Sequence, residues 1–254
     1  MAERKSATKR ATNRGAGTTS VRSQRRKRIR EGLAQRLKGW LPAGLASPAA
    51  APTGGPKPNA VSPAEAVKRL ADGNARYAAN QPNEKDFSSG RAARETAQYP
   101  IAAILSCADS RVAPELLFDQ GPGELFVVRV AGNVVSTELL ASLEYGVEFL
   151  GIPLVVVLGH TSCGAVDAAI KVLKKDAKLP GHLPDLIRAI KPAVVIAEKA
   201  PSKALLDDSI AQNVRRQVAA LKRANPILAR EYEAQKIDVI GAVYDLATGR
   251  VTRV

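Results

Sequence analysis

Three short, continuously apolar runs constrain the fold of this chain more than any other feature of its sequence. They lie at residues 101–106, 125–130 and 154–158. Strands that are buried on both faces of a parallel sheet read as unbroken apolar runs, whereas strands with one solvated face alternate. Helical spacing of apolar residues follows the second and third runs, over residues 137–150, 164–175, 183–199 and 203–224. This alternation of strands and helices is typical of an α/β fold.

The segments before and after this alternation also predict secondary structure. Ser62 is followed by a proline and, three residues on, by a glutamate, which predicts a helix from there to about residue 80. A fourth apolar run at 237–244 is followed by Thr248-Gly249 and a short segment at 251–254, which predicts a hairpin. The sequence therefore predicts a mostly parallel central sheet of about four strands plus an antiparallel C-terminal edge strand, flanked by helices.

The net charge of +14 is concentrated in the first 60 residues, which hold 14 Lys and Arg against two acids. Residues 61–254 hold 24 basic and 22 acidic residues and are close to neutral, so the overall charge says little about what they bind. The first segment is rich in Arg, Ser, Thr, Ala, Gly and Pro, with little apolar surface to offset the entropy of ordering. We expect a basic, largely disordered tail and linker at 1–60 and one folded domain at 61–254.

The tail leaves the cellular location and a tail partner open. Arg25-Arg26 and the alanine-rich stretch 46–51 are similar to a twin-arginine export signal, but Glu31, Arg36 and Lys38 fall where such a signal needs an uncharged core. Two cysteines are too few for a disulfide scaffold, which agrees with a reducing compartment. We expect a cytoplasmic protein, with export to the periplasm as the alternative. The tail is either an arm for an unknown partner, membrane or nucleic acid, or a solvated segment without a specific role.

Two polar clusters directly follow the first and third apolar runs. Cys107, Asp109 and Arg111 follow the first run, and His160 and Cys163 follow the third. The carboxyl ends of neighbouring parallel strands meet at one edge of a sheet, so these side chains can converge on one point. Two thiolates, one imidazole and one carboxylate form a ligand set for tetrahedral zinc, and thiolate with imidazole disfavours magnesium and calcium.

Other uses of these residues stay open. The two cysteines can be inert buried thiols or form a disulfide, but neither accounts for the neighbouring aspartate and histidine. A nucleophilic cysteine with His160 as its base would not need the second cysteine. A closed structural zinc site without catalysis uses the same ligands. Thr161 and Ser162 are predicted to cap the following helix, and His182, which lies in a Pro/Gly turn, is predicted to be solvated.

Four segments, in this order, resemble the β-class carbonic anhydrases. They are 107–115 (CADSRVAPE), 123–133 (GELFVVRVAGN), 141–146 (ASLEYG) and 156–166 (VVLGHTSCGAV). The resemblance covers most of residues 62–254 and leaves the first 60 outside. It implies the reversible hydration of carbon dioxide to bicarbonate and a proton by a zinc-bound hydroxide, with one Zn²⁺ per chain.

The resemblance also implies the roles of the polar clusters. Cys107, His160 and Cys163 resemble the zinc ligands of the family, with Asp109 as a fourth ligand in a closed state. In the open state, Arg111 draws Asp109 off the metal through a charge-assisted pair, and water takes the vacated position. Asp109 and Arg111 are therefore the residues implied to act in catalysis.

The resemblance implies a substrate cleft that is shared between subunits. By its position, Gln98 resembles the amide that hydrogen-bonds substrate, and Gly164 offers a backbone N–H at a helix start for the same purpose. Phe126 and Tyr145 resemble apolar cleft residues that the neighbouring subunit supplies. The chain is therefore expected to form a homodimer or a higher even-numbered homo-oligomer.

Some members of the family are regulated by bicarbonate at a second site that includes a tryptophan three residues before the first cysteine. This chain has Ile104 there, although Arg129 and Tyr244 resemble two other members of that site. The resemblance therefore implies an unregulated, open form.

Two other functions are also consistent with these ligands and this tail. Relatives with the same fold and ligands act on carbon disulfide or carbonyl sulfide, and a zinc-containing scaffold whose basic tail binds an acidic partner is a further alternative.

Two thiolates bring a zinc site to about zero charge. Its water should therefore ionise less easily than in the three-histidine carbonic anhydrases, where that pKa lies near 7. We expect hydration to rise on the alkaline side of about pH 7.

Overall fold

The computed structural model describes residues 61–88, 91–199 and 204–254. The predicted tail and linker, with the segment similar to an export signal, lie outside the described residues, so the cytoplasmic location stays a prediction. No helix within the described ranges is long and apolar enough to cross a membrane.

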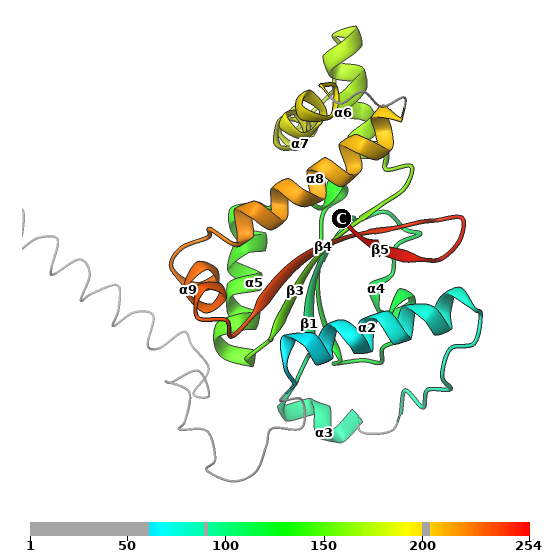
Figure 1. Ribbon diagram of the computed structural model, residues 1–254, viewed down its shortest axis with the longest axis vertical. Helices are drawn as coiled ribbons and strands as arrows, with labels where there is room; N and C mark the ends of the chain where they lie inside the picture. Colours follow the sequence, from blue (N-terminus) through cyan, green and yellow to red (C-terminus); the bar gives the residue numbers. More distant parts are fainter. Residues whose placement is uncertain (1–60, 89–90, 200–203) are drawn as a thin grey trace, which may run out of the picture. The chain divides into compact units, whose positions relative to one another are not determined.

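One five-stranded sheet, in the order β2-β1-β3-β4-β5, forms the centre of the fold (Figure 1). Strands β1 to β4 pair in parallel, and β5 pairs antiparallel to β4 as the C-terminal edge strand. The predicted fold class is therefore confirmed. The strands are Ala102–Ser106 (β1), Leu125–Arg129 (β2), Leu154–His160 (β3), Asp238–Tyr244 (β4) and Val251–Arg253 (β5).

The two central strands explain the unbroken apolar runs, because every residue of β1 and β3 is buried. The prediction for β3 was short by two residues. Gly159 and His160 continue the strand by pairing with Val243 and Tyr244 of β4, although neither is an aliphatic residue that extends the apolar pattern. His160 is therefore the last residue of a strand rather than a residue that follows it.

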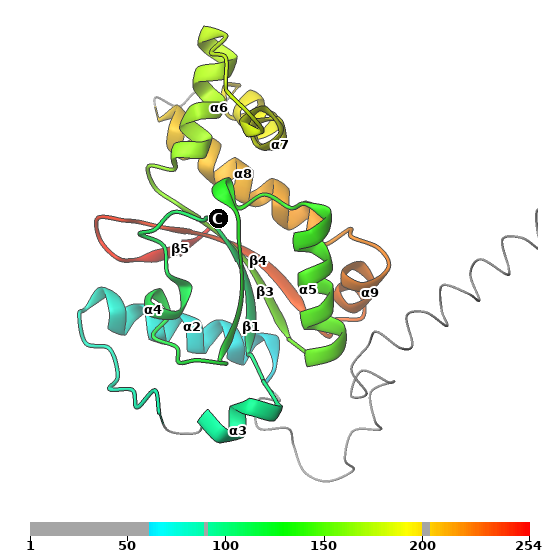
Figure 2. The same ribbon diagram turned by 180° about the vertical axis from the view of Figure 1, so that it is seen from behind.

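Helices cover both faces of the sheet. On one face, Leu70 of α2 packs with Ile104 and Val156, and on the other, α5, α8 and α9 pack against Leu105 and Val157. A third cluster joins α6 and α7 to the ends of β1 and β3, where these helices extend beyond the sheet (Figures 1 and 2). The helices are Pro63–Ala78 (α2), Arg91–Thr96 (α3), Pro114–Leu117 (α4), Thr137–Leu150 (α5), Gly164–Lys175 (α6), Leu183–Ala197 (α7), Leu205–Leu221 (α8) and Ile227–Glu233 (α9), with a 3₁₀ turn, η1, at Ala131–Asn133.

The predicted helix starts are confirmed where capping or periodicity was strong. Ser62 accepts a hydrogen bond from Glu65 N at 3.1 Å, and α5 and α6 have the predicted bounds. The short helices α3, α4 and α9 were not predicted, because helices of four to seven residues contain too few turns to display a period.

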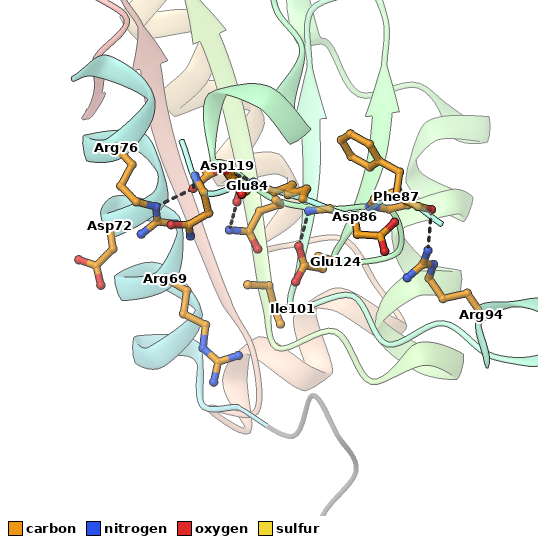
Figure 3. A pocket seen from close by; sticks show the side chains of 15 residues that line it. Arg69, Asp72, Arg76, Glu84, Asp86, Phe87, Arg94, Ile101, Asp119 and Glu124 are labelled. Atoms are coloured by element: carbon orange, nitrogen blue, oxygen red, sulfur yellow. Dashed lines mark hydrogen bonds and ion pairs between the residues drawn. The ribbon is translucent and has the colours of Figure 1, made fainter. Parts of the chain in front are cut away.

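A buried carboxylate, which the sequence analysis missed, joins the segment after α4 to α2 and to the segment that follows α2. Asp119 is 1% exposed at its side chain. It accepts hydrogen bonds from Arg76 Nε at 2.6 Å, from Asn83 N at 3.1 Å and from Lys85 Nζ. Figure 3 shows the pocket around this group, with Arg76 of α2 reaching Asp119. Three segments of the chain are thus joined through one side chain.

We expect Asp119→Asn to lower the free energy of unfolding by roughly 3 kcal/mol at pH 7, because it leaves two partly buried cations without their counter-charge. Burial alone would raise the pKa of Asp119, but Lys85, Arg76 and the Asn83 amide together hold it below its usual value. A folded-state pKa below the unfolded value gives stability that is present above about pH 4 and is lost as pH falls through the folded pKa.

The difference between wild type and Asp119→Asn should therefore shrink as the pH falls from 6 towards 3, as measured by urea unfolding. The matched control is Asp72→Asn, which removes an exposed carboxylate bonded to Lys68 on α2 and should change stability by less than about 1 kcal/mol. A difference that does not vary with pH would contradict the role given to the ion pairs.

Candidate metal centre

The ends of β1 and β3 bring the two polar clusters together. The strands pair in parallel, with Ser106 opposite Leu158, so Cys107 and His160 leave the same edge of the sheet. One ligand atom each from Cys107, His160 and Cys163 all lie within 4.8 Å of one another, and all three residues are buried. The convergence expected from the strand ends is therefore present, and this group could hold a metal ion.

His160 is oriented for a ligand by its own neighbour. Its Nδ1 lies 2.9 Å from the Thr161 carbonyl oxygen, which can only accept, so Nδ1 carries the proton and Nε2 carries the free lone pair. Nε2 is buried and has no hydrogen-bond partner among the residues that the structure describes. A buried polar atom without a partner is costly, so a metal ion fits this position.

A hydrogen bond links the two thiols. The hydrogen bond from Cys163 is the main reason that the pKa of Cys107 falls to about 4, and the same bond, together with burial, raises the pKa of Cys163. Burial alone would lower the pKa of His160, but the adjacent Cys107 thiolate outweighs it and raises that pKa. The site thus collects thiolate and imidazole donors, which are ligands of zinc rather than of magnesium or calcium.

Asp109 lies next to this group but is bound to Arg111. Arg111 Nε lies 2.9 Å from Oδ1 and Nη2 lies 2.7 Å from Oδ2, so the pair is bidentate. The Arg111 guanidinium holds the pKa of Asp109 well below its usual range. Asp109 Oδ2 remains 3.8 Å from His160 Nε2. This is the arrangement that the family resemblance implies for an open state, with the carboxylate ionised beside the ligand group.

Arg129 supports the same loop from β2. Its Nε donates to the Cys107 carbonyl at 3.0 Å and its Nη2 to the Asp109 carbonyl at 2.6 Å. The Tyr244 hydroxyl lies 3.3 Å from that of Tyr77. Burial and the neighbouring Tyr77 raise the pKa of Tyr244 to about 12, so the Tyr244 hydroxyl stays protonated at neutral pH.

The turn from β3 into α6 differs from the prediction. The residue that caps α6 is Cys163, without a side-chain hydrogen bond, and Thr161 Oγ1 instead accepts from Leu246 N at 3.0 Å. The prediction that Thr161 and Ser162 cap this helix is wrong, because the cap position falls on Cys163 and the Thr161 hydroxyl joins the turn to the segment after β4. Gly164 opens α6 with open space at its Cα, directly after the ligand Cys163.

The other predicted cleft residues lie together on the surface, not around the three ligands. Gln98 and Tyr145 line one pocket, whose lining contains none of the three ligand residues. The Phe126 ring lies 6.4 Å from that of Tyr145, and Phe149 lies 5.3 Å beyond, measured between centroids. Tyr145 is 39% exposed and Phe149 58%. Within the described residues, this pocket and the candidate metal group are therefore separate features.

Three residues near the ligands were missed by the sequence analysis. Gly132 N donates to Cys107 Sγ at 3.3 Å. On α8, Asn213 donates to the Gly132 carbonyl and Gln217 accepts from Val135 N, just after the turn. Two amides four residues apart on the buried face of a predicted helix were the only sequence signal of this contact.

Comparisons with known proteins agree with this geometry. A family model described as carbonic anhydrase matches residues 102–251. A carbonic anhydrase of Mycolicibacterium smegmatis is 42% identical over 191 residues, covering 75% of this chain and 92% of that protein. A carbonic anhydrase of Pseudomonas aeruginosa is 40% identical over 167 residues, covering 61% and 74%. The structure of a Coccomyxa β-carbonic anhydrase in complex with acetazolamide matches with a TM-score of 0.59 at 31% identity, covering 75% of this chain and 84% of that one.

Proposed function

The chain belongs to the β class of the carbonic anhydrases and catalyses the hydration of carbon dioxide, and we propose that Cys107, His160 and Cys163 hold one zinc ion for it. The observation that carries this proposal is the buried trio of two sulfurs and a ring nitrogen within 4.8 Å. The partnerless Nε2 of His160 supports it, and the two sulfur donors favour zinc over harder divalent ions.

The residues around the ligands have distinct tasks in the reaction. A zinc ion at this position would supply a hydroxide nucleophile from water and an electrostatic anchor for the product. Asp109 accepts a hydrogen bond from the attacking water and turns it towards carbon dioxide. Arg111 keeps that carboxylate ionised and away from the ligand group through its two hydrogen bonds. The Gly164 N–H, at the start of α6, favours the bicarbonate anion.

The cleft is proposed to be completed across a homodimer or a higher even-numbered assembly. Gln98, Phe126 and Tyr145 are proposed to bind substrate from the neighbouring subunit. Their grouping on an exposed surface, with the adjacent ring of Phe149, supports this arrangement. The likeness to carbonic anhydrases over 92% of a relative's length favours carbon dioxide over carbon disulfide or carbonyl sulfide.

Stopped-flow hydration of carbon dioxide by the purified full chain tests the function directly. We expect one zinc per chain and a rate that rises between pH 7 and 9. The two thiolates of Cys107 and Cys163 cancel the charge of a divalent ion, which makes water at the site harder to ionise. Elemental analysis of the same sample gives the zinc content.

The same preparation should sediment at an even multiple of 26.9 kDa. A hydration rate that is flat and maximal at pH 6.5 would contradict the charge argument. A chain without bound zinc and without activity would overturn the proposed metal centre.

A further inference from the structure

One metal-ligand sulfur receives a backbone hydrogen bond from outside the ligand group. Gly132 N, in the 3₁₀ turn η1 after β2, lies 3.3 Å from Cys107 Sγ, and both residues are buried. A hydrogen bond to a thiolate draws charge away from the sulfur and fixes its direction, and such outer contacts commonly tune metal affinity. The orientation of the Gly132 amide therefore matters for the ligand.

Gly132 cannot hold this orientation by itself. Its φ of 73° lies in the left-handed region, which glycine enters freely and leaves as freely. A residue with a side chain would be strained at this φ, and its Cβ would lie 2.6 Å from Ile190 Cδ1 and 3.3 Å from Ala165 Cβ. The restraint has to come from a neighbouring element.

Two buried side-chain amides on α8, hydrogen-bonded to each other, provide that restraint. Asn213, which is 1% exposed, donates from Nδ2 to the Gly132 carbonyl at 2.8 Å. Gln217, one turn further along, donates from Nε2 to Asn213 Oδ1 at 3.3 Å and accepts from Val135 N at 3.0 Å. Because Gln217 Nε2 donates, the Asn213 atom that it contacts must be the amide oxygen, Oδ1. The Asn213 nitrogen, Nδ2, therefore faces the Gly132 carbonyl.

We infer that Asn213 is a positioning residue for the metal centre. By holding the Gly132 carbonyl, it aims the Gly132 N–H at Cys107 Sγ. The inference rests on the proposed binding of a metal ion by Cys107. It adds a residue 50 positions or more away in sequence from each of the ligands, on a helix that carries none of them.

The test compares Asn213→Leu with wild type in metal binding rather than in activity alone. Leucine has the same branching and the same number of side-chain heavy atoms as asparagine, but it has no hydrogen-bond donor. We expect zinc to bind about 10- to 100-fold more weakly in competition with a chromophoric chelator. In cobalt-substituted protein, the sulfur-to-cobalt charge-transfer band should move to longer wavelength, because a sulfur without its hydrogen bond holds its electrons less tightly.

The matched control is Leu221→Ala, which opens the buried face of the same helix two turns away. It should lower thermal stability while leaving zinc affinity and the cobalt band at their wild-type values. Wild-type affinity and an unmoved band in Asn213→Leu would overturn the inference. A wild-type chain that binds neither zinc nor cobalt would instead overturn the proposed function.

A second measurement covers the case in which Asn213→Leu does not fold. Asn213→Asp keeps the side-chain shape but turns an oxygen towards the Gly132 carbonyl, and it should weaken zinc binding in the same direction. In the ¹¹³Cd-loaded wild type, a scalar coupling between cadmium and the Gly132 amide proton through Cys107 Sγ is expected. Absence of this coupling would contradict the hydrogen bond on which the inference depends.

Discussion

Replacing Cys163 by serine is expected to remove the bound zinc and to reduce carbon dioxide hydration on the order of a thousandfold or more. Loss of an outer contact commonly costs 10- to 100-fold, and loss of a direct ligand should exceed that range. A serine hydroxyl does not ionise near neutral pH, so it cannot replace the thiolate, and the remaining Cys107 and His160 provide only two donors. Zinc per chain and the stopped-flow rate should fall together.

The two histidines of the chain offer a matched pair for the same prediction. His160→Ala removes a buried ligand, whereas His182→Ala changes an exposed residue at the start of α7. We expect the first variant to lose zinc and activity and the second to retain both. Circular dichroism checks that each variant is folded. A folded His160→Ala variant with full zinc content would refute the assignment of this ligand.

Asp109→Asn is expected to lower the hydration rate by about 100- to 1,000-fold while zinc stays at one per chain. General acid and base groups contribute rate factors of roughly this size. The amide cannot carry the negative charge that pairs with Arg111 and accepts a hydrogen bond from the attacking water. This result separates Asp109 from the three ligands, because its replacement should affect the rate and not the metal content.

Asp185→Asn serves as the control for Asp109→Asn. Asp185 forms an exposed ion pair with Arg188 Nη2 at 2.8 Å on α7, away from the ligands, and its loss should change neither rate nor zinc. An Asp109→Asn variant with the wild-type rate would show that the carboxylate does not act in catalysis. Loss of zinc in the same variant would show instead that Asp109 is needed to hold the metal.

The sheet and the ligand trio were accessible from sequence because both depend on short-range patterns. Continuous burial of β1 and β3 leaves an unbroken apolar run, and parallel pairing places the residues after both strands at one edge. The end of β3 was misplaced because pairing with β4 continues through Gly159 and His160, which no apolar pattern marks.

The long-range hydrogen bonds and ion pairs that support the sheet and the metal group could not be predicted from the sequence. Asp119 bonds Arg76 over 43 residues, and Asn213 bonds Gly132 over 81. Each of these side chains is an ordinary polar residue in its own segment. Only burial against a distant part of the chain, where a polar group must find a partner, gives it a structural role.

The sequence by itself determined the α/β class, the residues that can ligate a metal and the order in which they follow their strands, because these depend on composition and local period. Tertiary structure alone decided the distances among the ligands, the ion pairs of the buried Asp119 and the support of Cys107 from α8. These features depend on how side chains meet after the chain has folded, and hydrogen bonds and ion pairs weaken steeply within an ångström or two of misplacement.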